Sequence, residues 1–190
     1  MNLGHESAWA VLMPVALLCC RRPEAMRAGT GPAGLLLRAV FADRDTHEIA
    51  QLSDAVAGDA AVSAAPRPRG RGLLADLASR PGRDVEAWLA ILPGPEERAA
   101  GLISLVQSRS ATAVRHSIGW VLVHPAARRR GIARALVAHA CRRAAELAAE
   151  AVWIECRSDW AESLTFWRAV GFEDRDRYAT AATGARQPHH

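Results

Sequence analysis

Residues 119–137 constrain the fold more than any other stretch of this 190-residue sequence. Residues 120–123 are aromatic, aliphatic or β-branched and end just before Pro125, which predicts a short strand. From Ile132 on, apolar residues recur three and four positions apart, which predicts a long helix. The chain is therefore expected to pass from a strand directly into a helix through a short loop.

That loop, residues 128–134, is basic and contains one glycine. The first backbone N–H groups of a helix have no intrahelical partners, and together with the positive end of the helix dipole they bind phosphate. Gly131 has no Cβ to block a close approach, and Ala133 keeps the next turn small. Neither the P-loop pattern nor the dinucleotide glycine pattern is present. The alternative is an exposed basic run with an ordinary loop glycine.

The strand, loop and helix resemble the acetyl-coenzyme A loop of the general N-acetyltransferase (GNAT) superfamily. Five residues stand at the positions of that pattern: Val123, Pro125, Arg128, Gly131 and Ala133. Residues 165–172 resemble the second signature of the same family. The resemblance covers about residues 35–178. It implies an α/β (mixed α+β) GNAT fold with flanking helices, whose mostly antiparallel central sheet contains one splayed parallel strand pair.

The rest of the chain supplies elements in the order that this fold requires. Strands are expected at 35–41, 85–92, 100–108, 116–123 and 152–156, with the last two parallel. Helices are expected to begin at Thr46, around Leu73, after Gly131 and near Asp159. For the last of these, Asp159 and Glu162 are related to a capping box, and Gly171 ends the helix.

Residues 1–33 are expected to be a disordered extension outside the domain. Their apolar run, residues 8–20, is too short to span a bilayer and contains Pro14, and the charges beside it have the wrong polarity for a signal peptide. A chain starting at Met26 should then fold as well as the whole chain. The domain itself is expected at 34–178, followed by a disordered tail at 179–190.

Charge and cysteine usage limit the ligands and the location. The net charge is +4, and residues 128–143 hold six arginines and no carboxylate, which favours a ligand with several phosphates. The sequence has no basic stretch interspersed with aromatic residues, so we do not expect nucleic acid as a partner. The cysteines show no metal-ligand spacing, so we expect no metal and a cytoplasmic protein with reduced thiols. They are Cys19, Cys20, Cys141 and Cys156. Because the apolar run at 8–20 is too short to span a bilayer, we also expect no membrane contact.

The resemblance implies acetyl-CoA as co-substrate. The backbone of one splayed strand would pair with the pantetheine arm, at Val121, Leu122 and Val123. Backbone N–H groups of the loop would bind the pyrophosphate, from Arg128, Arg129, Arg130, Gly131, Ile132, Ala133 and Arg134. Trp160 and Trp167 stand where the family has a coenzyme-contacting asparagine and a tyrosine that protonates the leaving thiolate. A tyrosine-acid mechanism therefore does not carry over.

The acceptor amine must lose a proton, which requires a base or a water held by one. Glu155 is the first candidate, because it interrupts an apolar strand and aligns with a glutamate proposed as base in the ribosomal-protein alanine acetyltransferases. His116 is the second. Ser117 stands where many relatives have a glutamate and could position a water. An exposed glutamate and a structural histidine remain the alternatives.

The implied activity is transfer of an acetyl group from acetyl-CoA to a primary amine, by direct attack in a ternary complex. The acceptor would be a small molecule or a protein N-terminus. The absence of the family's tyrosine and asparagine leaves a second reading open, a catalytically weak acyl-CoA-binding regulatory module. A homodimer is also left open.

Overall fold

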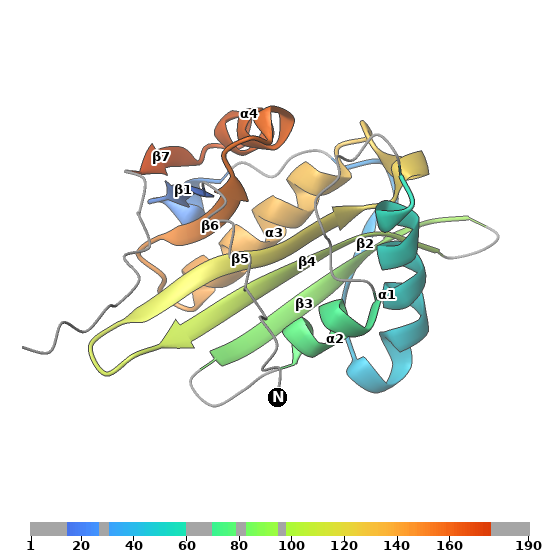
Figure 1. Cartoon of the computed structure of the whole chain (residues 1–190), viewed down its shortest axis with the longest axis horizontal. Coiled ribbons are helices and arrows are strands. Elements are labelled where there is room, and N and C mark those ends of the chain that lie inside the picture. Colours follow the sequence, from blue (N-terminus) through green and yellow to red (C-terminus); the bar gives the residue numbers. More distant parts are fainter. Residues whose placement is uncertain (1–14, 27–30, 60–69, 79–82, 95–97, 176–190) are drawn as a thin grey trace, which may run out of the picture.

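A computed structural model describes residues 15–26, 31–59, 70–78, 83–94 and 98–175 (Figure 1). The elements are β1 (Val15–Cys20), η1 (Pro23–Ala25), β2 (Leu36–Ala39), α1 (Ala42–Ala57), α2 (Gly70–Leu77), β3 (Arg83–Leu92), β4 (Arg98–Arg109), β5 (Val114–Val123), η2 (Pro125–Ala127), α3 (Ile132–Glu146), β6 (Val152–Arg157), α4 (Ala161–Ala169) and β7 (Glu173–Arg175), where η denotes a 3₁₀ helix.

The strands form one seven-stranded sheet in the order β2-β3-β4-β5-β6-β1-β7. All neighbouring pairs are antiparallel except β5 and β6, which are parallel and are joined through α3. The predicted fold class is therefore confirmed: a mixed α/β protein whose sheet is mostly antiparallel and contains one parallel pair.

The N-terminal prediction was wrong for the part that the structure describes. Residues 15–20 are not an extension but strand β1, which lies between β6 and β7 and pairs with both. Leu17, Leu18, Cys19 and Cys20 are all buried. The described part of the apolar run is thus a strand with four buried residues, whose partners lie more than 130 residues further along the chain. Residues 1–14, 27–30 and the expected tail at 179–190 lie outside the described residues.

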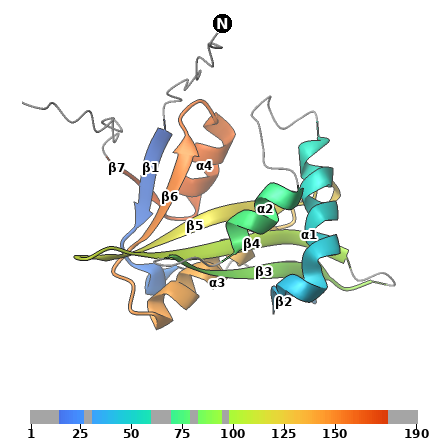
Figure 2. The same cartoon turned by 60° about the horizontal axis from the view of Figure 1, so that its bottom comes forward.

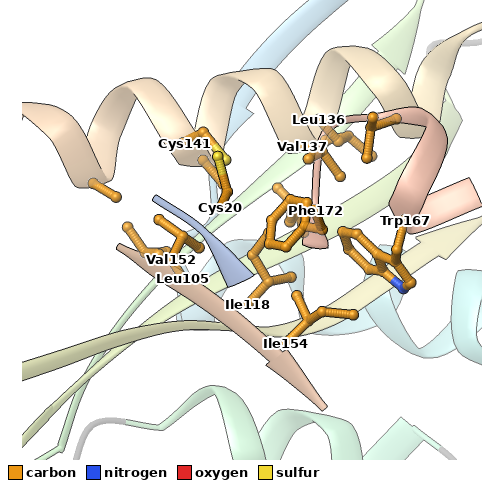
Figure 3. Packing of buried hydrophobic residues seen from close by; sticks show 14 of the residues in the cluster. Cys20, Leu105, Ile118, Leu136, Val137, Cys141, Val152, Ile154, Trp167 and Phe172 are labelled. Atoms are coloured by element: carbon orange, nitrogen blue, oxygen red, sulfur yellow. The ribbon is translucent and has the colours of Figure 1, made fainter. Parts of the chain in front are cut away.

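Helices cover both faces of the sheet. Figure 2 shows α3 on one face and α1 with α2 on the other. The core on the α3 face contains Leu136 and Val137 of the helix, with Ile118 and Ile154 of the central strands (Figure 3). The smaller core on the α1 face contains Ile49, Leu52, Leu73, Leu102 and Leu122. Strands β3, β4 and β5 therefore send side chains into both cores.

Two helices begin differently from the prediction. α1 begins at Ala42, one turn before Thr46, because the buried carboxylate of Asp45 accepts the backbone N–H of Phe41 (2.8 Å) and two hydrogen bonds from Arg38. α4 begins at Ala161 without a side-chain cap, since Asp159 instead pairs with Arg157. These carboxylates are engaged by arginines, which the local sequence pattern does not reveal.

The predicted end of α4 is correct. Gly171 adopts φ 97°, and its N–H donates to the carbonyl of Arg168. The N–H of Phe172 donates to the carbonyl of Trp167 at 3.0 Å, which completes a Schellman motif. The motif turns the chain so that Phe172 packs edge to face against Trp167.

Candidate functional site: the start of α3 and the gap between β5 and β6

The loop before α3 has an unusual backbone. Two of its residues have positive φ, Arg129 (61°) and Gly131 (81°). Left-handed residues placed in this way turn successive N–H groups toward one side of the chain, which makes an anion-binding concavity. Gly131 is the N-cap of α3 and meets this conformation without the steric cost that a Cβ adds.

The N–H groups at the start of α3 remain available. The first intrahelical bond that closes on the N-cap runs from the N–H of Ala135 to the carbonyl of Gly131 (3.0 Å), and no side chain caps the helix. The N–H groups of residues 131–134 therefore have no intrahelical acceptor. Buried Ile132 anchors the turn in the core, while Ala133 is half-buried and Gly131 is exposed. The arrangement fits a phosphate or pyrophosphate.

The loop arginines fall into two groups. Arg129, Arg130 and Arg134 are exposed and surround the helix start with positive charge. Arg128 is instead engaged, since its guanidinium forms an ion pair with Asp59 and donates from Nε to the carbonyl of Val123 at 3.4 Å. Asp59 follows α1, and sequence reasoning missed it. Arg128 thus links the loop to the opposite layer of the fold.

β5 contains a bulge that reorients its second half. The β4–β5 register shifts between Ile103 and Leu105, so that Gly119 and Trp120 face the single residue Ser104. The Ser104 hydroxyl accepts the N–H of Trp120 (2.9 Å). Such an insertion bends the strand and increases its twist.

The bulge also exchanges the two faces of the strand. Before it, Ile118 packs into the core on the α3 face. After it, Trp120 and Leu122 pack on the α1 face, and Val121 and Val123 pack on the α3 face. A regular strand would place residues 118, 120 and 122 on one face.

β5 and β6 are paired only where they begin. Within the described residues, their parallel ladder contains His116 with Val152 and Ser117 with Trp153, and it stops at the bulge. After the bulge, the three residues predicted to contact the pantetheine arm pair with β4 on one edge of β5. On the other edge they no longer pair with β6. They are Val121, Leu122 and Val123. The expected divergence of the parallel pair is therefore present.

The structure places Glu155 and Ser117 on the same face. Ser117 is the partner of Trp153, and Glu155 lies two residues further along β6, while Ile154 between them points into the core. The Glu155 side chain is 71% exposed, and its carboxylate lies 3.9 Å from Arg115. The same arginine stacks 4.9 Å from the centre of the Trp153 ring. The first base candidate is thus open to solvent and held beside a cation.

His116 lies on the opposite face. It is two residues before Ile118, is 4% exposed, and its Nε2 lies 3.0 Å from the side-chain nitrogen of Gln107. Burial lowers the pKa of His116, the positive charge of Arg109 lowers it further, and Glu86 opposes both. The structure therefore does not bring His116 together with Glu155 and Ser117.

The two tryptophans differ in their surroundings. Trp167 is 7% exposed and lies between Phe166 and Phe172, which makes it part of the core (Figure 3). Trp160 is the half-buried N-cap residue of α4, with the guanidinium of Arg157 5.5 Å from its ring centre. A contact between either ring and the coenzyme stays a prediction.

The described residues hold neither a metal-binding cluster nor a membrane-spanning helix. No group of three His, Cys, Asp or Glu side chains there could hold a metal ion. No helix in the described ranges is long and apolar enough to cross a membrane.

Comparison with known proteins gives a family and a set of similar folds. The family model described as the acetyltransferase (GNAT) family matches residues 74–172. These residues include α3, both strands of the parallel pair and the Schellman turn after α4. No curated protein matches the sequence significantly.

Three solved structures show the range of similar folds. A tandem GNAT protein from the clavulanic acid biosynthesis pathway matches with a TM-score of 0.65 at 20% identity, over 87% of this chain and 51% of its own. A protein assigned to the GNAT family from Novosphingobium aromaticivorans gives 0.60 at 17%, over 86% and 60%. An acetyltransferase from Trypanosoma brucei gives 0.54 at 24%, over 75% and 95%. The chain thus spans only half to three fifths of the first two, and these likenesses show the fold.

Proposed function

Since this chain belongs to the acetyltransferase (GNAT) family, we propose that it transfers an acetyl group from acetyl-CoA to a primary amine of a small molecule or a protein N-terminus. The observation that supports the proposal most strongly is the start of α3. There, left-handed Gly131 and the N–H groups of residues 131–134 form a site for a pyrophosphate. Acetyl-CoA carries such a group.

The divergence of β5 and β6 fits the rest of the co-substrate. Residues 121–123 have left the β6 ladder, so their backbone groups on that edge can pair with the amides of an extended pantetheine arm. The arm would run from the loop at 128–134 toward Ser117, where the strands rejoin. Its thioester would then lie near the face that holds Glu155.

The proposed chemistry is a direct acyl transfer. The amine nitrogen attacks the thioester carbon and the carbon–sulfur bond breaks, so the amine loses a proton and the sulfur gains one. Glu155 accepts the amine proton, directly or through a water that Ser117 positions. Water protonates the leaving thiolate, because Trp167 is buried in the core and its indole N–H is a very weak acid.

The burial of Trp167 also favours a second candidate function. A domain that binds acyl-CoA but transfers the acyl group slowly would keep the α3 site and lack an acid for the thiolate. Such a domain would act as a regulatory module rather than as an enzyme.

One assay separates the two candidates. Purified protein is mixed with acetyl-CoA and a panel of polyamines, aminoglycosides and peptides with free N-termini, and the released CoA thiol is measured. Protein without acetyl-CoA gives the background from its own cysteines. Thiol release with at least one amine supports the enzyme. Tight acetyl-CoA binding without release for any amine supports the module, and the absence of binding rejects both.

A further inference from the structure

Two buried thiols from distant parts of the chain lie side by side, one in β1 and one in α3 (Figure 3). Cys20 ends β1 and Cys141 lies in the middle of α3, and Figure 3 shows their sulfur atoms side by side. Cys141 is fully buried and Cys20 is 6% exposed. The two side chains are hydrogen bonded to each other, and both are free thiols.

Their surroundings make the two thiols unequal. The hydrogen bond from Cys141 lowers the pKa of Cys20 to about 7; burial opposes this, the Arg22 backbone assists it, and the charges of Glu24 and Glu173 oppose it. The same hydrogen bond, with burial, raises the pKa of Cys141, whose proton it holds. Cys20 is therefore the thiol that ionises near neutral pH.

Cys20 is also the thiol that a small reagent can reach. It lines a cavity of about 620 Å³ together with Arg21, Arg22 and Arg134. The thiolate is the reactive form of cysteine, and here the hydrogen bond with Cys141 rather than a charged neighbour favours it. Cys141 stands behind it, in contact with its sulfur.

The other two cysteines lack this arrangement. Cys19 points to the opposite side of β1, where its sulfur accepts a hydrogen bond from Arg175 at 3.1 Å. Burial raises the pKa of Cys156. A bond between Cys19 and Cys20 would distort a strand in which both residues pair with β6.

We propose that hydroperoxides oxidise Cys20 to a sulfenic acid. Cys141 then reacts with this sulfenic acid to form a Cys20–Cys141 disulfide. In the first step the Cys20 thiolate attacks one peroxide oxygen, the O–O bond breaks, and the leaving oxygen takes a proton to give water or an alcohol. Cys20 is oxidised to a sulfenic acid. In the second step the Cys141 sulfur attacks the Cys20 sulfur, an S–S bond forms, the S–O bond breaks, and water leaves with the Cys141 proton.

The disulfide would connect β1 to α3, two elements that are otherwise joined by noncovalent contacts. A crosslink that closes a long loop restricts the unfolded chain most. We therefore expect oxidation to raise the Tm of the intact chain by about 5–10 °C.

The test treats the full-length chain with hydrogen peroxide. Thiol titration should fall from four free thiols to two, intact mass should fall by about 2 Da, and peptide mapping should identify a Cys20–Cys141 bond. Cys141→Ser should stop at the sulfenic acid, which dimedone traps on Cys20. Cys20→Ser should reduce dimedone labelling about tenfold or more. Cys19→Ser and Cys156→Ser are the matched controls and should still form the bond.

Two results would overturn the proposal: retention of all four thiols, or a disulfide that maps to another pair such as Cys19–Cys20. Circular dichroism of every variant before oxidation shows whether it is folded. If Cys20→Ser is not, Cys20→Ala, which leaves no unpaired hydroxyl, takes its place. None of these readouts depends on acetyl transfer.

Discussion

Leu17 of β1 is the antiparallel partner of Glu155 of β6. Strand β1 therefore lies beside β6, the strand that holds the proposed base, on the edge of β6 opposite β5. The geometry of β6 depends on β1 as much as on the parallel pair. A change in β1 should consequently affect both stability and the proposed site.

The first prediction concerns Leu18, which is completely buried opposite Ile154. Leu18→Asp places a carboxylate in the core and should cost about 4 kcal/mol or more, a fall in Tm of about 10 °C. Val15→Asp in the same strand is the control, because Val15 is 40% exposed and should change Tm by no more than about 2 °C. Equal melting of the two variants would show that β1 does not pack as described.

Because β1 pairs with β6 and β7 and carries four buried residues, a chain that starts at Met26 should fail to fold stably.

The second prediction concerns Gly131. In Gly131→Glu, a side chain and a negative charge enter the proposed pyrophosphate site, and the loss of two charge-assisted hydrogen bonds should weaken acetyl-CoA binding on the order of 10²-fold or more. Because φ is 81°, the substitution should also cost about 1 kcal/mol of stability. Calorimetric titration measures the first effect and thermal melting the second.

Ala148→Glu is its matched control. Ala148 is also exposed and left-handed (φ 56°), but it follows the C-terminal end of α3. The same side chain should there leave coenzyme affinity unchanged. If Gly131→Glu binds acetyl-CoA as tightly as the parent, this loop does not bind the pyrophosphate.

The third prediction concerns Glu155. Glu155→Gln keeps the shape of the side chain and removes its ability to take a proton, so kcat should fall on the order of 10²-fold with nearly intact coenzyme affinity. Glu150→Gln, at an exposed glutamate before β6, should leave kcat unchanged. An unaltered pH–rate profile in Glu155→Gln would transfer the role to a water or to His116.

The fourth prediction concerns Asp45. Burial raises its pKa, but hydrogen bonds from the Phe41 backbone, Arg38 and Arg44 outweigh burial and leave the pKa below its ordinary value of 3.8. Asp45→Asn should cost about 2–3 kcal/mol at pH 7. Exposed Asp43→Asn, in the same helical turn, should cost about 0.5 kcal/mol.

The sign of the pH effect follows from that lowered pKa. The folded state binds the Asp45 proton more weakly than the unfolded state, so the stabilisation is complete above pH 3.8 and is lost as pH falls through the folded-state pKa. Urea denaturation from pH 7 to pH 2 should show the parent and Asp45→Asn converging at the acid end. A constant difference would exclude an ionised Asp45 as its source.

Local signals in the sequence were sufficient for the parts of the fold with local causes. The strand that ends before Pro125, the helix that begins after Gly131 and the stop at Gly171 were all predicted from neighbouring residues. The place of β1 was not, because its partners in β6 and β7 are far away in sequence. An apolar run shows that a segment can be buried, but not what covers it.

The candidate site divides in the same way. The sequence predicted the loop at 128–134, since a helix start and a glycine are local features. It did not predict the ion pair between Arg128 and Asp59, which joins residues almost 70 positions apart. It offered Glu155 and His116 together as bases, whereas strand alternation places them on opposite faces. The bulge at Gly119 and Trp120 was also missed, because it depends on Ser104 in the neighbouring strand.

The position of β1 also sets an order of assembly during translation. Ribosomes add roughly 5–20 residues per second, so residues 15–20 leave the ribosome on the order of ten seconds before residues 152–157 exist. Through that interval an apolar strand has neither of its neighbours, and it is open to pairing with another nascent chain or to capture by a chaperone. Helices and strands between residues 36 and 146 can assemble first through nearer contacts. The sheet is then completed last, when β1 pairs with β6 and β7 beside the proposed acetyl-transfer site.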